Sequence, residues 1–129
     1  MTIALAAHVA DEALTGFLDV YNPNVRALRE RFAWFPMPTF TFDVWLTGLL
    51  LLVAVLLALT PLASRGARLA RVLAIPFAIV IGLMNGFGHL GSSLYFGRWM
   101  PGATTAPLLI ACGAWLLTLS TRSRVTSES

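Results

Sequence analysis

The sequence has little charge. Only 12% of its 129 residues are Asp, Glu, Lys or Arg, against about 25% in a typical soluble domain. Lysine is absent, so the net charge of +3 comes from nine arginines, and hydrophobic residues make up 57% of the chain. So few charged groups cannot cover a soluble surface, and we therefore predict an integral membrane protein.

Several signatures of known chemistry are also missing. The chain contains no P-loop, GxSxG, CxxC or HExxH motif, and a single cysteine, Cys112, excludes an internal disulfide. The arginines lie at loops and segment ends and form no basic stripe with interleaved aromatic residues. A nucleic-acid partner is therefore not expected, whereas membrane lipid is.

Four apolar segments predict the helices of one transmembrane domain over residues 1–121. They cover about 3–21, 43–62, 73–96 and 104–119, and the second is long enough to cross a hydrocarbon core of ~30 Å. The "NPN" sequence at 22–24 is expected to end the first helix. The polar tail, 122–129, is expected to be disordered. The sequence thus predicts an all-α, four-helix membrane bundle.

A short interfacial helix is expected after the first segment. In "VRALRERFAW", residues 25–34, Arg26, Arg29 and Arg31 would reach lipid headgroups while Phe32 and Trp34 sit at the acyl boundary.

Two of the apolar segments carry polar side chains at helical spacing. In the first, His8 and Glu12 are four residues apart and Asp11 borders the same face; in the third, Asn85 and His89 are four apart. An ionisable group at bilayer depth costs several kcal/mol unless it faces protein or water. We therefore expect the two polar stripes to face each other.

Small residues favour close approach of these two helices. Gly82 and Gly86 form a small-xxx-small pair in the third segment, and we expect that pair to support packing on the first segment.

The polar residues together suggest a metal site. His8, Glu12, His89 and Asn85 offer nitrogen and oxygen ligands that would suit zinc, non-haem iron or manganese. A carboxylate not used as a ligand, Asp11 or Glu12, could act as a general base. Three alternatives remain open: a hydrogen-bond network that fixes helix register, a proton relay, and His89 as axial ligand of a haem or pigment.

These residues carry a family resemblance. The chain resembles the HXXEE-domain proteins, a bacterial family of small multi-helix membrane proteins without a characterised function. The motif corresponds to "HVADE", His8 to Glu12, with Asp11 in place of the first glutamate. It is followed by "NGFGH", Asn85 to His89, and by "GRWMPGATTAPLL". The resemblance covers about residues 6–117 and implies a polar active or binding site at those motif residues, in a multi-pass protein of the bacterial inner membrane.

Two classes of function follow from the sequence. The first is metal-assisted or acid–base chemistry on a lipid-soluble substrate. The second is a non-enzymatic accessory subunit that packs around a larger membrane complex and uses its polar stripe for helix register or pigment binding. The sequence therefore leaves open whether the protein is an enzyme.

Overall fold

The described residues of the computed structural model, 1–65 and 68–125, form helices and loops without any strand, as the all-α prediction requires. Six α-helices and one π-helix follow one another along the chain: α1 (Thr2–Thr15), α2 (Phe17–Arg31), α3 (Phe42–Ser64), α4 (Arg68–Phe77), η1 (Ala78–Met84), α5 (Asn85–Phe96) and α6 (Ala106–Val125).

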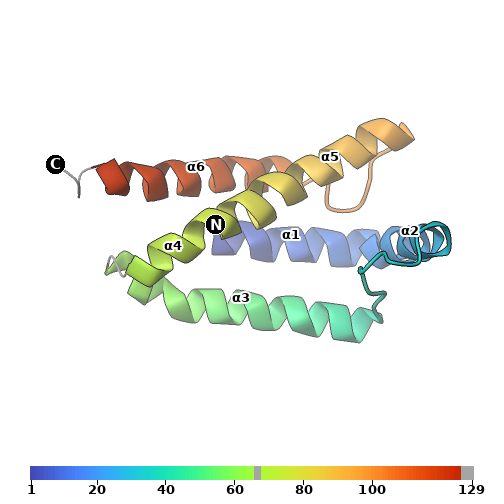
Figure 1. The fold of residues 1–129 in the computed structure, drawn as a ribbon, viewed down its shortest axis with the longest axis horizontal. Coiled ribbons are helices and arrows are strands. Elements are labelled where there is room, and N and C mark those ends of the chain that lie inside the picture. The colour runs from blue at the N-terminus through green and yellow to red at the C-terminus, as the bar shows by residue number, and fades with distance from the viewer. Residues whose placement is uncertain (66–67, 126–129) are drawn as a thin grey trace.

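Helix α1 packs against both α3 and α6 (Figure 1). Helices α4, η1 and α5 follow one another as a long rod that runs obliquely across the molecule, and α6 packs along η1 and α5. The core consists of small and branched side chains from α1, α3 and α6: Ala4, Leu5, Val9, Val53 and Leu109. This packing holds the middle of α1 close to α6.

The first expected helix is interrupted earlier than predicted. The break falls at Gly16, whose φ of 77° lies in the left-handed region that glycine adopts at no steric cost. The predictions of a helix over 3–21 that ends at the asparagines, and of a separate one over 25–34, were therefore wrong, because α2 runs through Pro23. Asn22 does not end the helix; its side-chain amide donates to Phe40 O and accepts from Phe40 N.

The glycine pair of the third segment packs on a different helix from the one predicted. A Cβ at Gly82 would lie 2.7 Å from Gly113 Cα, and one at Gly86 would lie 2.6 Å from Ile110 Cγ1. Both contacts are with α6. Gly113 is the small residue of α6 that lies opposite Gly82. The expectation that this pair supports packing on the first segment was wrong, although Met1 Cε would lie 3.2 Å from a Cβ at Gly82.

Within the described part of the chain, two helices are long and apolar enough to cross a membrane: Phe42–Leu62 and Val72–Phe96. A shorter apolar stretch covers Ala106–Thr121. Helix α6 continues to Val125, whereas the predicted disordered tail covered 122–129, of which 126–129 lie outside the described residues.

Candidate metal centre

Helix α1 supplies two of the polar side chains. His8 and Glu12 lie one turn apart on the face that also buries Ala4, Leu5 and Val9. His8 is 0% exposed and Glu12 is 6% exposed. A carboxylate and an imidazole at this depth need polar partners, because burial without them costs free energy.

Helix α5 brings the third side chain to the same point. His89 Nε2 lies 3.1 Å from Glu12 Oε1, and His8 Nε2 lies 3.6 Å from the same oxygen. The two imidazole rings meet edge to face, with their centroids 4.7 Å apart. The polar residues of the two segments therefore face each other, and His8, Glu12 and His89 form a buried cluster that could hold a metal ion.

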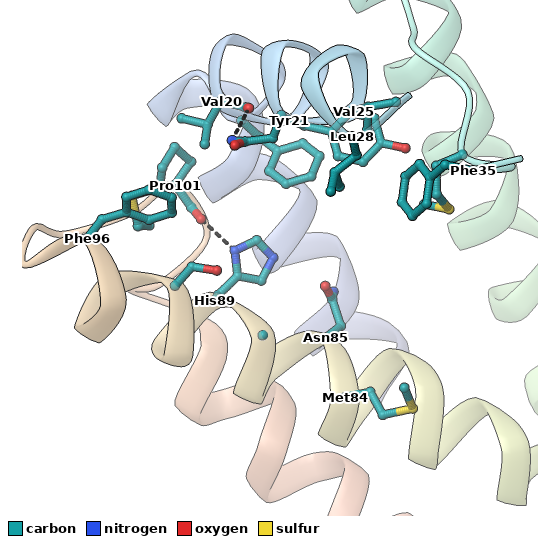
Figure 2. Close-up of a pocket in the computed structure, with 16 residues that line it drawn as sticks. Val20, Tyr21, Val25, Leu28, Phe35, Met84, Asn85, His89, Phe96 and Pro101 are labelled. Atoms are coloured by element: carbon teal, nitrogen blue, oxygen red, sulfur yellow. Dashed lines mark hydrogen bonds between the residues drawn. The ribbon is translucent and has the colours of Figure 1, made fainter. Parts of the chain in front are cut away.

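The loop between α5 and α6 closes over both histidines. Pro101 O lies 2.6 Å from His89 Nδ1 (Figure 2) and, being a carbonyl, must accept a hydrogen bond from that nitrogen. Gly102 has a φ of 80°, and a Cβ there would lie 2.7 Å from His89 Cε1 and 3.0 Å from His8 Cε1. A glycine is therefore required at this position on two counts, its backbone conformation and its contact with the two rings.

Thr105 joins His8 to Asp11. Its hydroxyl lies 2.8 Å from His8 Nδ1 and donates to Asp11 Oδ2 at 2.9 Å. Its backbone N–H donates to the same carboxylate oxygen at 3.1 Å. Since the single hydroxyl proton goes to the carboxylate, the Thr105 oxygen accepts from His8 Nδ1. Asp11 thus acts on His8 through Thr105.

Both imidazoles are consequently held with Nδ1 protonated and Nε2 turned toward Glu12. His8 Nε2 is buried and has no hydrogen-bond partner among the described residues, which costs about 1–3 kcal/mol for a polar atom left unsatisfied. His89 Nε2 and Glu12 Oε1 lie 3.1 Å apart, a contact that a proton or a metal ion between them would make favourable. The three atoms therefore require something positive between them.

The spacing of these atoms suits a metal ion. Ligand atoms bound to a tetrahedral ion at about 2.0–2.1 Å lie about 3.3–3.4 Å from one another, and the distances from Glu12 Oε1 to the two Nε2 atoms are 3.1 and 3.6 Å. All three ligand atoms lie within 4.8 Å of each other. Hydrogen bonds from the far nitrogen of each histidine to a carbonyl or hydroxyl are the usual support of metal-bound imidazoles.

Asn85 lies beside this cluster, where it lines an apolar cavity with His89 (Figure 2). That cavity has a volume of about 400 Å³. A second cavity of about 300 Å³ is lined by Glu12, Asp19 and Asn22, among others. One cavity therefore borders the cluster at His89 and the other at Glu12.

Three residues of the site were not predicted from the sequence: Pro101, Gly102 and Thr105. All three lie in the segment "GRWMPGATTAPLL", which entered only as part of the family resemblance. The available signal was the combination of a Pro-Gly pair with a nearby hydroxyl, directly before a helix. Nothing in their spacing from His8 could have revealed the contact, because it depends on how α6 packs on α1.

The fold and this site define a small helical protein with a buried two-histidine, one-glutamate cluster and two helices that could cross a membrane. A family model described as "protein of unknown function with HXXEE motif" matches residues 1–116 of the 129. The chain belongs to the HXXEE family, as its motifs suggested. A search of curated proteins found no match, and neither did a search of solved structures.

If the cluster holds a metal ion, replacing Thr105 by valine should weaken its binding about 10–100-fold, the usual loss when a ligand's supporting hydrogen bond is removed. Valine keeps the shape but gives His8 Nδ1 and Asp11 no hydroxyl. Thr105→Ser keeps the hydroxyl and serves as the control. Titration with Zn²⁺ against a fluorescent chelator measures both affinities, and equal affinities for the valine and serine variants would contradict the assigned role.

Proposed function

We propose that this protein is a metal-dependent membrane protein in which His8, Glu12 and His89 bind one divalent ion. The observation that carries the proposal is the buried His8 Nε2, which faces Glu12 without a hydrogen-bond partner among the described residues. Two histidines and one carboxylate are a ligand set used by catalytic zinc and by non-haem iron. Manganese binds the same donors more weakly.

The side chains have separate roles in this proposal. The histidines supply neutral nitrogen ligands, and Glu12 supplies the charged one. Asp11, which the sequence suggested as a general base, instead orients His8 through Thr105, because its Oδ2 already accepts two hydrogen bonds. A divalent ion with three protein ligands keeps a position for water or substrate and polarises what binds there.

The membrane bundle belongs to the same proposal. We place α1, α3, the α4–α5 rod and α6 in the bacterial inner membrane, with α2 at its surface. Large hydrophobic side chains on α3 are exposed on the isolated chain, as lipid contact requires: Val44, Leu50, Leu51, Val55, Leu57 and Leu59. The polar cluster faces the inside of the bundle, where an ionisable group can be tolerated.

A proton relay is the second candidate. The 3.1 Å separation of Glu12 Oε1 and His89 Nε2 also suits one shared proton. That proton would satisfy the pair but would leave His8 Nε2 without a partner, whereas an ion would satisfy all three atoms. The geometry therefore favours the metal.

Metal analysis tests the proposal directly. Detergent-purified protein, prepared without a histidine tag or chelators, should contain close to one divalent ion per chain by mass spectrometry. Cobalt(II) exchanged into the site should give visible d–d absorption. Glu12→Gln, which keeps the shape but removes the charge, should lower the Co²⁺ affinity by more than 10–100-fold, because a ligand contributes more than the groups that support it.

The control is the helical circular dichroism and elution volume of Glu12→Gln, which should match those of the wild type. Wild-type protein that contains no ion and binds none of Zn²⁺, Fe²⁺, Mn²⁺ or Co²⁺ would refute the proposal and leave the proton relay.

A further inference from the structure

The apolar cavity beside His89 has the size of a ligand site. Its volume of about 400 Å³ falls within the range of about 300–1,000 Å³ usual for small-molecule pockets. Its walls come from α2, from the segment that follows α2, from the end of η1, and from α5 with the loop after it. In Figure 2, His89 and Asn85 project from α5 toward the side chains of α2.

Polar side chains line the cavity from both sides, but Tyr21 and Asn24 of α2 already donate to the backbone oxygens of Pro38 and Val20. Asn85, His89 and Ser92 come from successive turns of α5, at spacings of four and three residues, and so share one face. Most of the remaining lining is hydrocarbon, aromatic or thioether: Phe17, Val20, Val25, Leu28, Phe35, Met37, Met84, Phe96 and Met100. This division suits an amphiphile with its polar end at α5 and its chain along α2.

The charges around the cavity favour an uncharged polar end. Among the described residues that line it, none is an arginine, aspartate or glutamate. Tyr21 is neutral as well, since burial raises the pKa of its phenol above the ordinary value of 10.0. Glu12 contacts His89, and Asp11 is linked to His8 through Thr105. Arg29 acts electrostatically on Tyr21 but does not itself line the cavity. An anionic headgroup inside the cavity therefore meets no arginine side chain.

We propose that this cavity binds a single-chain amphiphile whose polar end is an uncharged hydroxyl or carbonyl group. Asn85 and Ser92 bind that oxygen beside His89, one of the residues that would hold the ion, and the apolar wall holds the chain. The inference names the substrate class of the metal site and rests on the proposed function for its chemistry, but the binding itself requires only the cavity.

Two glycines of α5 offer a matched test of the cavity. A Cβ at Gly88 or at Gly91 meets no atom within 4 Å, so the first carbon of a side chain fits at either position. Gly88 lines the cavity, whereas Gly91 does not belong to its lining. A leucine at Gly88 therefore occupies the ligand's volume, and a leucine at Gly91 controls for the change of residue type in the same helix.

Photolabelling is the experiment. Protein in lipid nanodiscs is irradiated with a long-chain alcohol that carries a diazirine in its chain, and the adducts are mapped by mass spectrometry. We expect adducts in α2 and in residues 84–101, displaced by 1-dodecanol at concentrations at least 10-fold lower than by dodecanoate. Gly88→Leu should reduce these adducts at least 10-fold, while Gly91→Leu should leave them unchanged.

Several outcomes would overturn the inference. Equal displacement by dodecanoate would exclude an uncharged-head preference. Adducts spread over α3, as for bulk lipid, or undiminished labelling of a folded Gly88→Leu variant would exclude the cavity. If Gly88→Leu fails to fold, Gly88→Ala and Gly88→Val replace it. Labelling that does not decrease as the side-chain volume at residue 88 increases would also overturn the inference.

Metal content separates this inference from the proposed function. Both leucine variants should retain the wild-type ion, because neither position belongs to the cluster. Specific labelling of wild-type protein that binds no ion would preserve the ligand site and refute the metal. Wild-type protein that binds an ion but shows no specific labelling would preserve the proposed function and refute the ligand site.

Discussion

Replacing Gly102 by alanine is expected to abolish metal binding while most of the helical structure persists. The new Cβ would lie 2.7 and 2.8 Å from Cε1 and Nδ1 of His89 and 3.0 Å from Cε1 of His8. Both rings would have to move, and they cannot move without losing their hydrogen bonds to Pro101 O and Thr105 Oγ1. Cobalt titration and circular dichroism measure the two quantities.

The control for Gly102→Ala is Gly97→Ala. Gly97 also has a positive φ, of 62°, but a Cβ there meets no atom within 4 Å. Alanine in the left-handed region costs about 1–2 kcal/mol at either position, so the control shares the backbone strain and lacks the contact with the histidines. If the two variants bind cobalt equally well, the closeness of Gly102 to the rings has no functional consequence.

Removing either histidine should release the ion. His8→Ala and His89→Ala each leave two ligands of three, so we expect the metal content of the purified protein to fall from near one per chain to a trace. The loss should exceed the 10–100-fold expected for Thr105→Val, which removes only a supporting hydrogen bond. Mass spectrometry of the purified variants provides the measurement.

Asn85→Ala is the comparison for the histidine variants. The sequence suggested Asn85 as a ligand, and the side chain lines the cavity next to His89. In our proposal it binds substrate, so its alanine variant should retain the ion. Loss of the ion from Asn85→Ala would make this residue a fourth ligand, and retention of the ion by either histidine variant would contradict the site itself.

The sequence predicted the half of the site that depends on helical periodicity. His8 and Glu12 lie one turn apart, and an ionisable pair in an apolar helix must face protein. The same argument applied to His89, so the meeting of α1 and α5 at these residues could be predicted. Gly16 could not be recognised as the helix end, because a glycine inside an apolar run is also compatible with a continuous helix.

The other half of the site depends on packing between distant segments. Thr105 reaches His8 because α6 lies against α1, and α6 lies there partly because Gly113 and Gly82 let α6 and η1 approach. The sequence offered several small residues and no means of matching them in pairs. Backbone groups such as Pro101 O are still harder to predict, since every residue has a carbonyl and only the loop conformation selects one.

The distance along the chain between the parts of the site has a consequence for biogenesis. His8 and Thr105 are 97 residues apart, and translation at about 5–20 residues per second separates their synthesis by about 5–20 s. During that interval α1 carries a histidine and two carboxylates without His89 or Thr105. Helix α1 therefore cannot complete its packing until His89 and Thr105 have been made, and the ion of the proposed function could be held by all three ligands only after that point.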